Sequence, residues 1–187
     1  MIGTSSPSVS TIRRSRKMPN NGKLVIPADV AIVVANGPHM EEDIARLQEP
    51  FDVMAINRSM LAFKRPIKYW ATWHDSDDEE WRTCILLHAS NGYGMPLEGF
   101  SHCGGRFATH LPINCYGGGS TLYGALVCLN HLGYRKVIVA NSPLSGHYVE
   151  FLEGWRAALA EIKDKVRALS GEPKELLGEP TQEWLDS

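Results

Sequence analysis

An unbroken apolar run that ends at a glycine turn constrains this chain more than any other feature. The run covers residues 30–35 (VAIVVA) and shows no alternation of apolar and polar side chains. Such a strand is typical of a parallel sheet that is covered by helices on both faces. The run stops at Asn36-Gly37-Pro38, because glycine permits positive φ and proline lacks a backbone donor. Acidic residues at 41–43 then indicate the first turn of a helix.

Apolar segments of strand and helix type alternate along the rest of the chain. Further strands are predicted at 51–56, 67–73, 111–116, 136–140 and 166–169, and helices at 77–89 (with Ser76 as cap), 122–132, 149–162 and 172–177, with a long loop at 90–110. This alternation predicts an α/β, Rossmann-like domain with a mainly parallel sheet flanked by helices.

The two ends of the chain differ from this predicted domain. Residues 1–24 are rich in serine and proline and carry basic but no acidic residues, which predicts a flexible basic tail. An alternative is a basic arm that binds nucleic acid or a partner protein. The nucleotide-binding domain is expected at 25–178, and a C-terminal tail at 179–187.

Composition excludes several classes of protein. A chain of 187 residues that is 43% apolar and 21% charged is typical of a single globular domain. Its net charge of −2 argues against nucleic acid as a partner, and no apolar run is long enough to span a membrane. Four scattered cysteines favour reduced thiols and a cytoplasmic location. A homo-oligomer is compatible with all of these features.

Polar side chains follow several predicted strands, at the point where each strand ends. They are Asn36, Asn57, Arg58, His74, Asp75 and Asn141. Because the carboxyl ends of parallel strands meet at one edge of the sheet, these residues are candidates for a shared ligand site.

A second glycine turn precedes the predicted helix at 122–132. Gly117, Gly118 and Gly119 are followed by Ser120 and Thr121, a pattern that offers backbone N–H groups and hydroxyls to a phosphate or carboxylate. No lysine precedes the hydroxyls, so this is not a Walker loop. The alternative interpretation is a tight loop that only closes against the sheet.

Metal-ligand spacing is weak in this chain. Its histidines and cysteines form neither a paired CxxC nor an HExxH pattern, so no metal site is predicted. His74, Asp75 and the acids after them suit Mg²⁺ on a diphosphate, although acids at a helix start are the commoner explanation. His147 follows the strand at 136–140 and is the candidate general base, with a solvated surface histidine as the alternative.

Four stretches carry a family resemblance: VVANGPHMEE with FDVMAINRS, GGGSTLYGALVCLNHLGYRKVIVANSPL, HY at 147–148, and KVRALSG. The chain resembles the bacterial sialyltransferases of glycosyltransferase family 42 and the related hydroxymethylpterin diphosphokinase-like proteins. The resemblance implies that a CMP-sugar lies against Asn36, Gly37, Pro38, Asn57, Ser120 and Thr121. It also implies that His147 is the base of a metal-independent transfer.

The chain departs from that family at three places. His39 stands where the family has serine, Pro143 stands where an aspartate ends the strand, and only residues 144–146 replace the acceptor-covering lid. A nucleotide cradle is therefore better supported than unmodified sialyl transfer.

These observations predict a nucleotide-sugar-dependent, glycosyltransferase-like enzyme that transfers a sugar to a hydroxyl acceptor without a cofactor. Its expected partner is a small nucleotide or nucleotide-sugar, held by the strand-end residues and the second glycine turn, with His39 beside them. The alternatives are a non-catalytic nucleotide sensor or sequestering protein, and a structural or assembly protein that keeps the fold alone.

Overall fold

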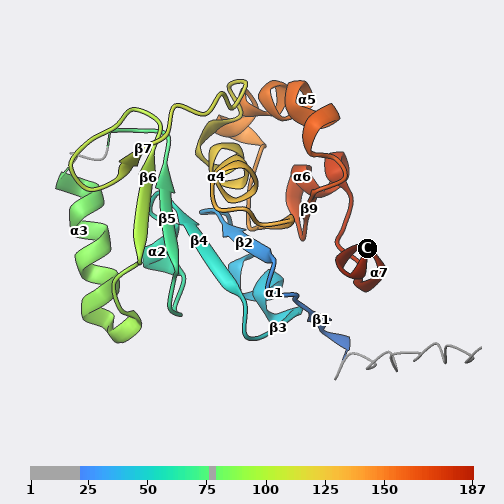
Figure 1. Cartoon of the computed structure of the whole chain (residues 1–187), viewed down its shortest axis with the longest axis horizontal. Helices are drawn as coiled ribbons and strands as arrows, with labels where there is room; N and C mark the ends of the chain where they lie inside the picture. Colours follow the sequence, from blue (N-terminus) through green and yellow to red (C-terminus); the bar gives the residue numbers. More distant parts are fainter. Residues whose placement is uncertain (1–21, 76–78) are drawn as a thin grey trace, which may run out of the picture.

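A computed structural model describes residues 22–75 and 79–187 as a single body, an α/β fold with helices on both sides of a sheet (Figure 1). Within these residues the sheet has seven strands, all parallel, in the order β7-β6-β5-β4-β2-β8-β9. The strands are β2 (Val30–Val34), β4 (Asp52–Ile56), β5 (Tyr69–Thr72), β6 (Glu98–Ser101), β7 (Thr109–His110), β8 (Lys136–Ala140) and β9 (Val166–Ala168). A separate parallel pair joins β1 (Leu24–Val25) to β3 (Leu47–Gln48). The predicted fold class is confirmed.

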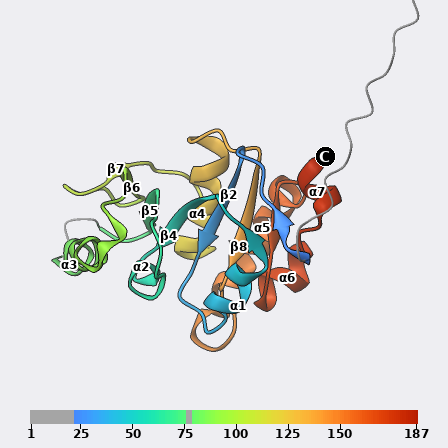
Figure 2. The same cartoon turned by 90° about the horizontal axis from the view of Figure 1, so that it is seen from below.

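Helices cover both faces of the sheet. They are α1 (Met40–Ala45), α2 (Ser59–Ala62), α3 (Glu79–His88), α4 (Gly119–Asn130), α5 (Phe151–Ile162), α6 (Gly171–Leu177) and α7 (Gln182–Asp186), with short helical turns η2 (Ala89–Tyr93) and η3 (Gly146–Tyr148). One core lies under α4 and α5, and the other lies under α1, α2, α3 and α7. Figure 2 shows α3 at one end of the sheet and α6 and α7 at the other.

The apolar run at the start of the domain serves both cores at once. Ala31 and Val33 of β2 face the core under α4, whereas Val30, Ile32 and Val34 face the core under α1. Successive side chains of a strand point to opposite faces, so a strand covered on both sides needs apolar residues at every position.

Two parts of the chain differ from the prediction. The segment expected as a loop at 90–110 contains η2, β6 and β7, with β7 at the edge of the sheet. The strand expected at 111–116 is absent from the described residues. β6 has the sequence EGFS, which contains no apolar run. Gly99 of this strand pairs with Trp70 of β5, and the Trp70 indole packs against Gly99 in place of a side chain from β6 itself.

The expected C-terminal tail also contains ordered structure. Residues 182–186 form α7, and Leu185 is fully buried in the core under α1. The Gln182 side chain accepts from the N–H of Val25 at 3.0 Å and donates to its carbonyl at 3.2 Å. This end of the chain is therefore part of the fold. The expected basic tail up to residue 21, and the cap at Ser76, lie outside the described residues.

The strand order changes direction at β2. The chain runs outward from β2 through β4, β5, β6 and β7 on one side, and then returns to add β8 and β9 on the other. The carboxyl ends of these parallel strands share one edge, where open α/β sheets bind ligands. In the described part of the chain, no helix is long and apolar enough to cross a membrane.

Candidate functional site

A cleft of about 330 Å³ lies at the carboxyl edge of the sheet, between the ends of β2, β4 and β5 and the start of α4. Seven residues predicted from the sequence line it: Asn36, Asn57, His74, Gly118, Gly119, Ser120 and Thr121. Eight further lining residues are Ala35, Ile56, Trp73, Gly117, Pro143, Leu144, Tyr148 and Phe151. The fold thus gathers both sets of sequence candidates, the strand ends and the second glycine turn, around one cavity.

The second glycine turn directs the N-terminus of α4 at this cleft. Tyr116, Gly117 and Gly119 all have positive φ (54°, 77° and 70°), and Gly118 is the N-cap of the 12-residue helix. The first N–H groups of a helix have no acceptor within it and carry the positive end of its dipole. A helix start of this kind favours an anion in the cleft.

Helix α5 holds the turn in place from behind. A Cβ atom on Gly154 of α5 would overlap the backbone of Gly117 and Gly118, and one on Gly119 would lie 3.2 Å from the Phe151 ring. The glycine turn is therefore packed against α5 as closely as a backbone permits.

Part of the donor capacity of the turn is already used within the protein. The backbone N–H groups of Gly117, Gly118 and Gly119 act on the Cys115 thiol, and Gly118 also donates to the Cys115 carbonyl at 2.7 Å. Burial raises the pKa of this thiol to about 11 against their opposing effect, so it stays neutral near pH 7. These N–H groups are therefore only partly available to a ligand.

The two hydroxyls at the start of α4 have different roles. Ser120 is buried, and its Oγ accepts from the backbone N–H of Trp73 at 2.9 Å, which ties the end of β5 to α4. Thr121 is half-buried, and in residues 22–75 and 79–187 its hydroxyl has no hydrogen-bond partner. Thr121 is thus the hydroxyl that remains for a ligand.

Two asparagine side chains face the same cavity from the strand ends. Asn36 is exposed, and Asn57 is half-buried with φ 52°, a left-handed conformation that asparagine adopts more readily than most residues. The Asn57 Oδ1 atom is buried and finds no partner among the described residues. A buried acceptor in this state is where a ligand donor would gain most.

Asn141, also predicted as a ligand residue, instead fastens two loops together. Its Nδ2 donates to the Ala35 carbonyl at 2.9 Å, its Oδ1 accepts from the His39 N–H at 2.6 Å, and its carbonyl accepts from the Gly37 N–H at 2.8 Å. This clasp closes the crevice between β2 and β8. Gly37 and His39 therefore belong to the clasp and Pro38 lies between them, and none of the three lines the cleft.

Asp43 supports the clasp and was not identified from the sequence. Its buried carboxylate accepts from the Asn141 N–H at 2.8 Å and from the Ser170 hydroxyl at 2.5 Å. From the sequence, Asp43 is accounted for as an acid in the first turn of a helix, where it interacts favourably with the helix dipole. Its hydrogen bonds to Asn141 and Ser170 depend on tertiary contacts that the sequence does not reveal.

Three other predicted residues lie beside the cleft or at its border. Arg58 is exposed and forms an ion pair with Glu80 of α3, and Asp75 is exposed outside the lining set. The backbone of His147 lies in η3, next to the lining residue Tyr148, whereas the His147 side chain is outside what the structure describes.

Aromatic rings form a wall that the sequence did not reveal. Tyr148 and Phe151 line the cleft with ring centroids 6.1 Å apart and planes 29° apart. Trp73 lines it as well and stacks on His102, with centroids 3.5 Å apart. Burial lowers the pKa of His102, which keeps that ring neutral. Aromatic faces beside a helix N-terminus suit a ligand with a flat ring and an anionic group.

Among the described residues, no group of three or more histidine, cysteine or acidic side chains is placed to hold a metal ion. Comparison of the chain with family models, curated proteins and solved structures gives no match.

Proposed function

We propose that the cleft binds a nucleotide and that the protein is a nucleotide-sugar-dependent, glycosyltransferase-like enzyme. The observation that carries the proposal is the start of α4, where a helix N-terminus and an unpartnered Thr121 hydroxyl meet an aromatic wall in one cavity. The volume of about 330 Å³ is near the lower end for ligand sites, which favours one nucleotide over a dinucleotide.

Each part of a nucleotide has a matching part of the cleft. The phosphate lies at the start of α4, where the Thr121 hydroxyl and the N–H groups at the helix start donate to it. The base stacks against Tyr148 or Phe151. Asn36 and Asn57 are placed for the ribose hydroxyls and the polar edge of the base, and a donor from the ligand would pair the buried Asn57 Oδ1.

The proposed reaction transfers the sugar to an acceptor hydroxyl. The acceptor oxygen forms a bond to the anomeric carbon while the bond from that carbon to the phosphate oxygen breaks, and a base takes the hydroxyl proton. The N-terminus of α4 stabilises the charge that develops on the departing phosphate. His147 is the first candidate for the base, and His74, which is among the residues that line the cleft, is the second.

Isothermal titration calorimetry with CMP, UDP and GDP and their sugar conjugates tests the binding step. We expect at least one of them to bind, and Thr121→Val to weaken it roughly 10-fold or more, because a hydrogen bond to a charged group is lost. Thr83→Val is the matched control, since Thr83 is exposed on α3 and lies outside the cleft. Folded protein that binds none of these nucleotides would contradict the proposal.

A non-catalytic nucleotide-binding protein is the second candidate. The observation in its favour is the short connection from β8 to η3, residues 141–145, which leaves no room for an acceptor-covering lid. Turnover of the bound nucleotide-sugar decides between the two. Slow turnover that His147→Ala or His74→Ala abolishes supports the enzyme, whereas tight binding without turnover supports the sensor.

A further inference from the structure

A second and larger cavity, of about 560 Å³, lies at the other end of the sheet between α3 and the edge strands β6 and β7. We propose that this groove binds one amphipathic anion, a molecule with an apolar chain and a carboxylate or phosphate-type head. The site is separate from the cleft described above, and none of its lining residues is shared with it.

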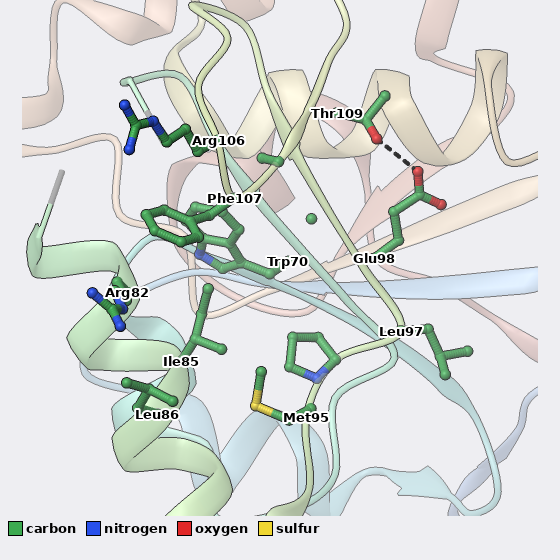
Figure 3. A pocket seen from close by; sticks show the side chains of 13 residues that line it. Trp70, Arg82, Ile85, Leu86, Met95, Leu97, Glu98, Arg106, Phe107 and Thr109 are labelled. Carbon is green, nitrogen blue, oxygen red and sulfur yellow. Dashed lines mark hydrogen bonds between the residues drawn. The ribbon is translucent and has the colours of Figure 1, made fainter. Parts of the chain in front are cut away.

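The floor and walls of the groove are apolar. Trp70 is fully buried at its base, and Ile85 and Leu86 of α3 face Met95 and Leu97 across it (Figure 3). The side chains of Leu86, Met95 and Leu97 are 51%, 57% and 76% exposed. Large apolar side chains gathered in one exposed hollow mark a place where an apolar partner is bound.

A glycine opposite Trp70 gives the groove its depth. Gly99 pairs with Trp70 in the β5–β6 register, and a Cβ atom there would lie 2.7 Å from the Trp70 ring. The indole therefore packs directly against the glycine. A larger residue in β6 would lift the ring into the groove and reduce the space for a chain.

Among the described lining residues, the positively charged side chains lie at one end of the groove. Arg82 and Arg106 lie on either side of Phe107, and the Arg82 guanidinium is 5.8 Å from the centre of that ring (Figure 3). Among the lining residues that the structure describes, the one carboxylate belongs to Glu98, which lies at the other end and accepts from the Thr109 hydroxyl at 2.9 Å. An anionic head at the arginines and an apolar chain over Trp70 match this distribution.

Two other occupants fit less well. The edge strand β7 is only two residues long, so an extended peptide would gain few ladder hydrogen bonds from it. The first 21 residues of this chain carry Arg13, Arg14, Arg16 and Lys17 and no acid, so the arginine end of the groove would repel them.

Calorimetry with decanoate, below its critical micelle concentration, tests the proposal on the full chain. We expect one site per chain, weaker binding of decanol, and no binding of decyltrimethylammonium. The double variant Arg82→Gln/Arg106→Gln should bind decanoate at least 10-fold more weakly. Arg156→Gln, a change at an exposed arginine of α5, should leave the affinity unchanged.

Several results would overturn the proposal. They are the absence of saturable decanoate binding, equal binding of the cationic analogue, an unchanged affinity in the double variant, and binding to anionic vesicles without binding of monomeric decanoate. Circular dichroism confirms that the double variant is folded, as expected because both arginines are exposed. Thr121→Val should not change decanoate binding, so the two proposed sites succeed or fail separately.

Discussion

The cleft proposed to bind a nucleotide and the apolar groove both take residues from β5, yet they are built in different ways. Trp73 and His74, just beyond the end of the strand, line the cleft, whereas Trp70 in its middle lines the groove. Backbone shapes the cleft, through a glycine turn, a helix start and the left-handed Asn57. Side chains shape the groove, with buried Trp70 at its base and exposed side chains on its rim. Changes behind the cleft should therefore cost stability, while changes on the rim of the groove should alter binding alone.

Loss of the clasp at Asn141 should have the largest effect. Asn141→Ala removes two hydrogen bonds at the ends of β2 and β8 and places alanine at φ 57°, so we expect a loss of about 3–4 kcal/mol in the free energy of unfolding. Asn141→Gly loses the same hydrogen bonds, but glycine adopts this φ without strain. Its free energy of unfolding should therefore fall by about 1 kcal/mol less than that of Asn141→Ala. Urea denaturation measures both. Equal stability of Asn141→Ala and the wild type would show that the clasp does not hold this edge together.

Closer packing at Gly154 should have the next largest effect. Glycine to alanine inside a helix normally gains about 0.5–1 kcal/mol, but here the new methyl group meets the backbone of the glycine turn, and we expect a loss of about 2–3 kcal/mol. Nucleotide affinity should fall and decanoate affinity should not. Ala160→Gly, at an exposed position of the same helix, measures the difference in stability between alanine and glycine in the absence of tertiary contacts. A stabilised Gly154→Ala would show that the turn has room to move.

Acid should weaken the region under the groove through His88. This ring is fully buried, Nδ1 lies 2.8 Å from the Met60 carbonyl, and burial lowers its pKa. The unfolded chain then binds more protons than the folded one below about pH 6.5, so the free energy of unfolding falls as the pH falls from there. We expect a decrease of about 1 kcal/mol between pH 7 and pH 5. His102 beside the cleft acts in the same direction, since burial lowers its pKa too.

Replacing His88 separates this effect from that of His102. His88→Gln keeps a donor for the Met60 carbonyl and removes the titration, so its stability should depend less on pH in urea denaturation. If the free energy of unfolding of His88→Gln changed with pH as steeply as that of the wild type, the assignment to His88 would be contradicted.

Changes on the rim of the groove should have the smallest effect on stability. Leu97→Ser removes a side chain that is 76% exposed, so we expect a change within about 0.5 kcal/mol, together with weaker decanoate binding. A large loss of stability in urea would mean that the groove is part of the core and not an open site.

The sequence predicted the parts of the fold that local pattern controls. Continuous apolar runs such as the one in β8 identified buried parallel strands, and glycine marked the start of α4. β6 was missed because its burial depends on Trp70 from another strand, and α7 because a short polar segment gives little sign that Leu185 is buried.

The site shows the same division between local and tertiary information. Residue types at strand ends singled out Asn36 and Asn57, and both residues line the cleft. The sequence gives no sign that the Asn141 side-chain amide is hydrogen-bonded to Ala35 and His39, because those hydrogen bonds form only when two distant loops meet.

The most direct test of nucleotide binding at the cleft is the ¹H–¹⁵N spectrum of the full chain during separate titrations with CMP, UDP and GDP. With at least one of them, the largest shifts should occur at the amides of Gly119, Ser120 and Thr121 and in the Asn36 side chain, while amides of residues 95–109 in the groove stay unchanged. Shifts centred on the groove, or no shifts with any of the three at millimolar concentrations, would contradict nucleotide binding at the cleft.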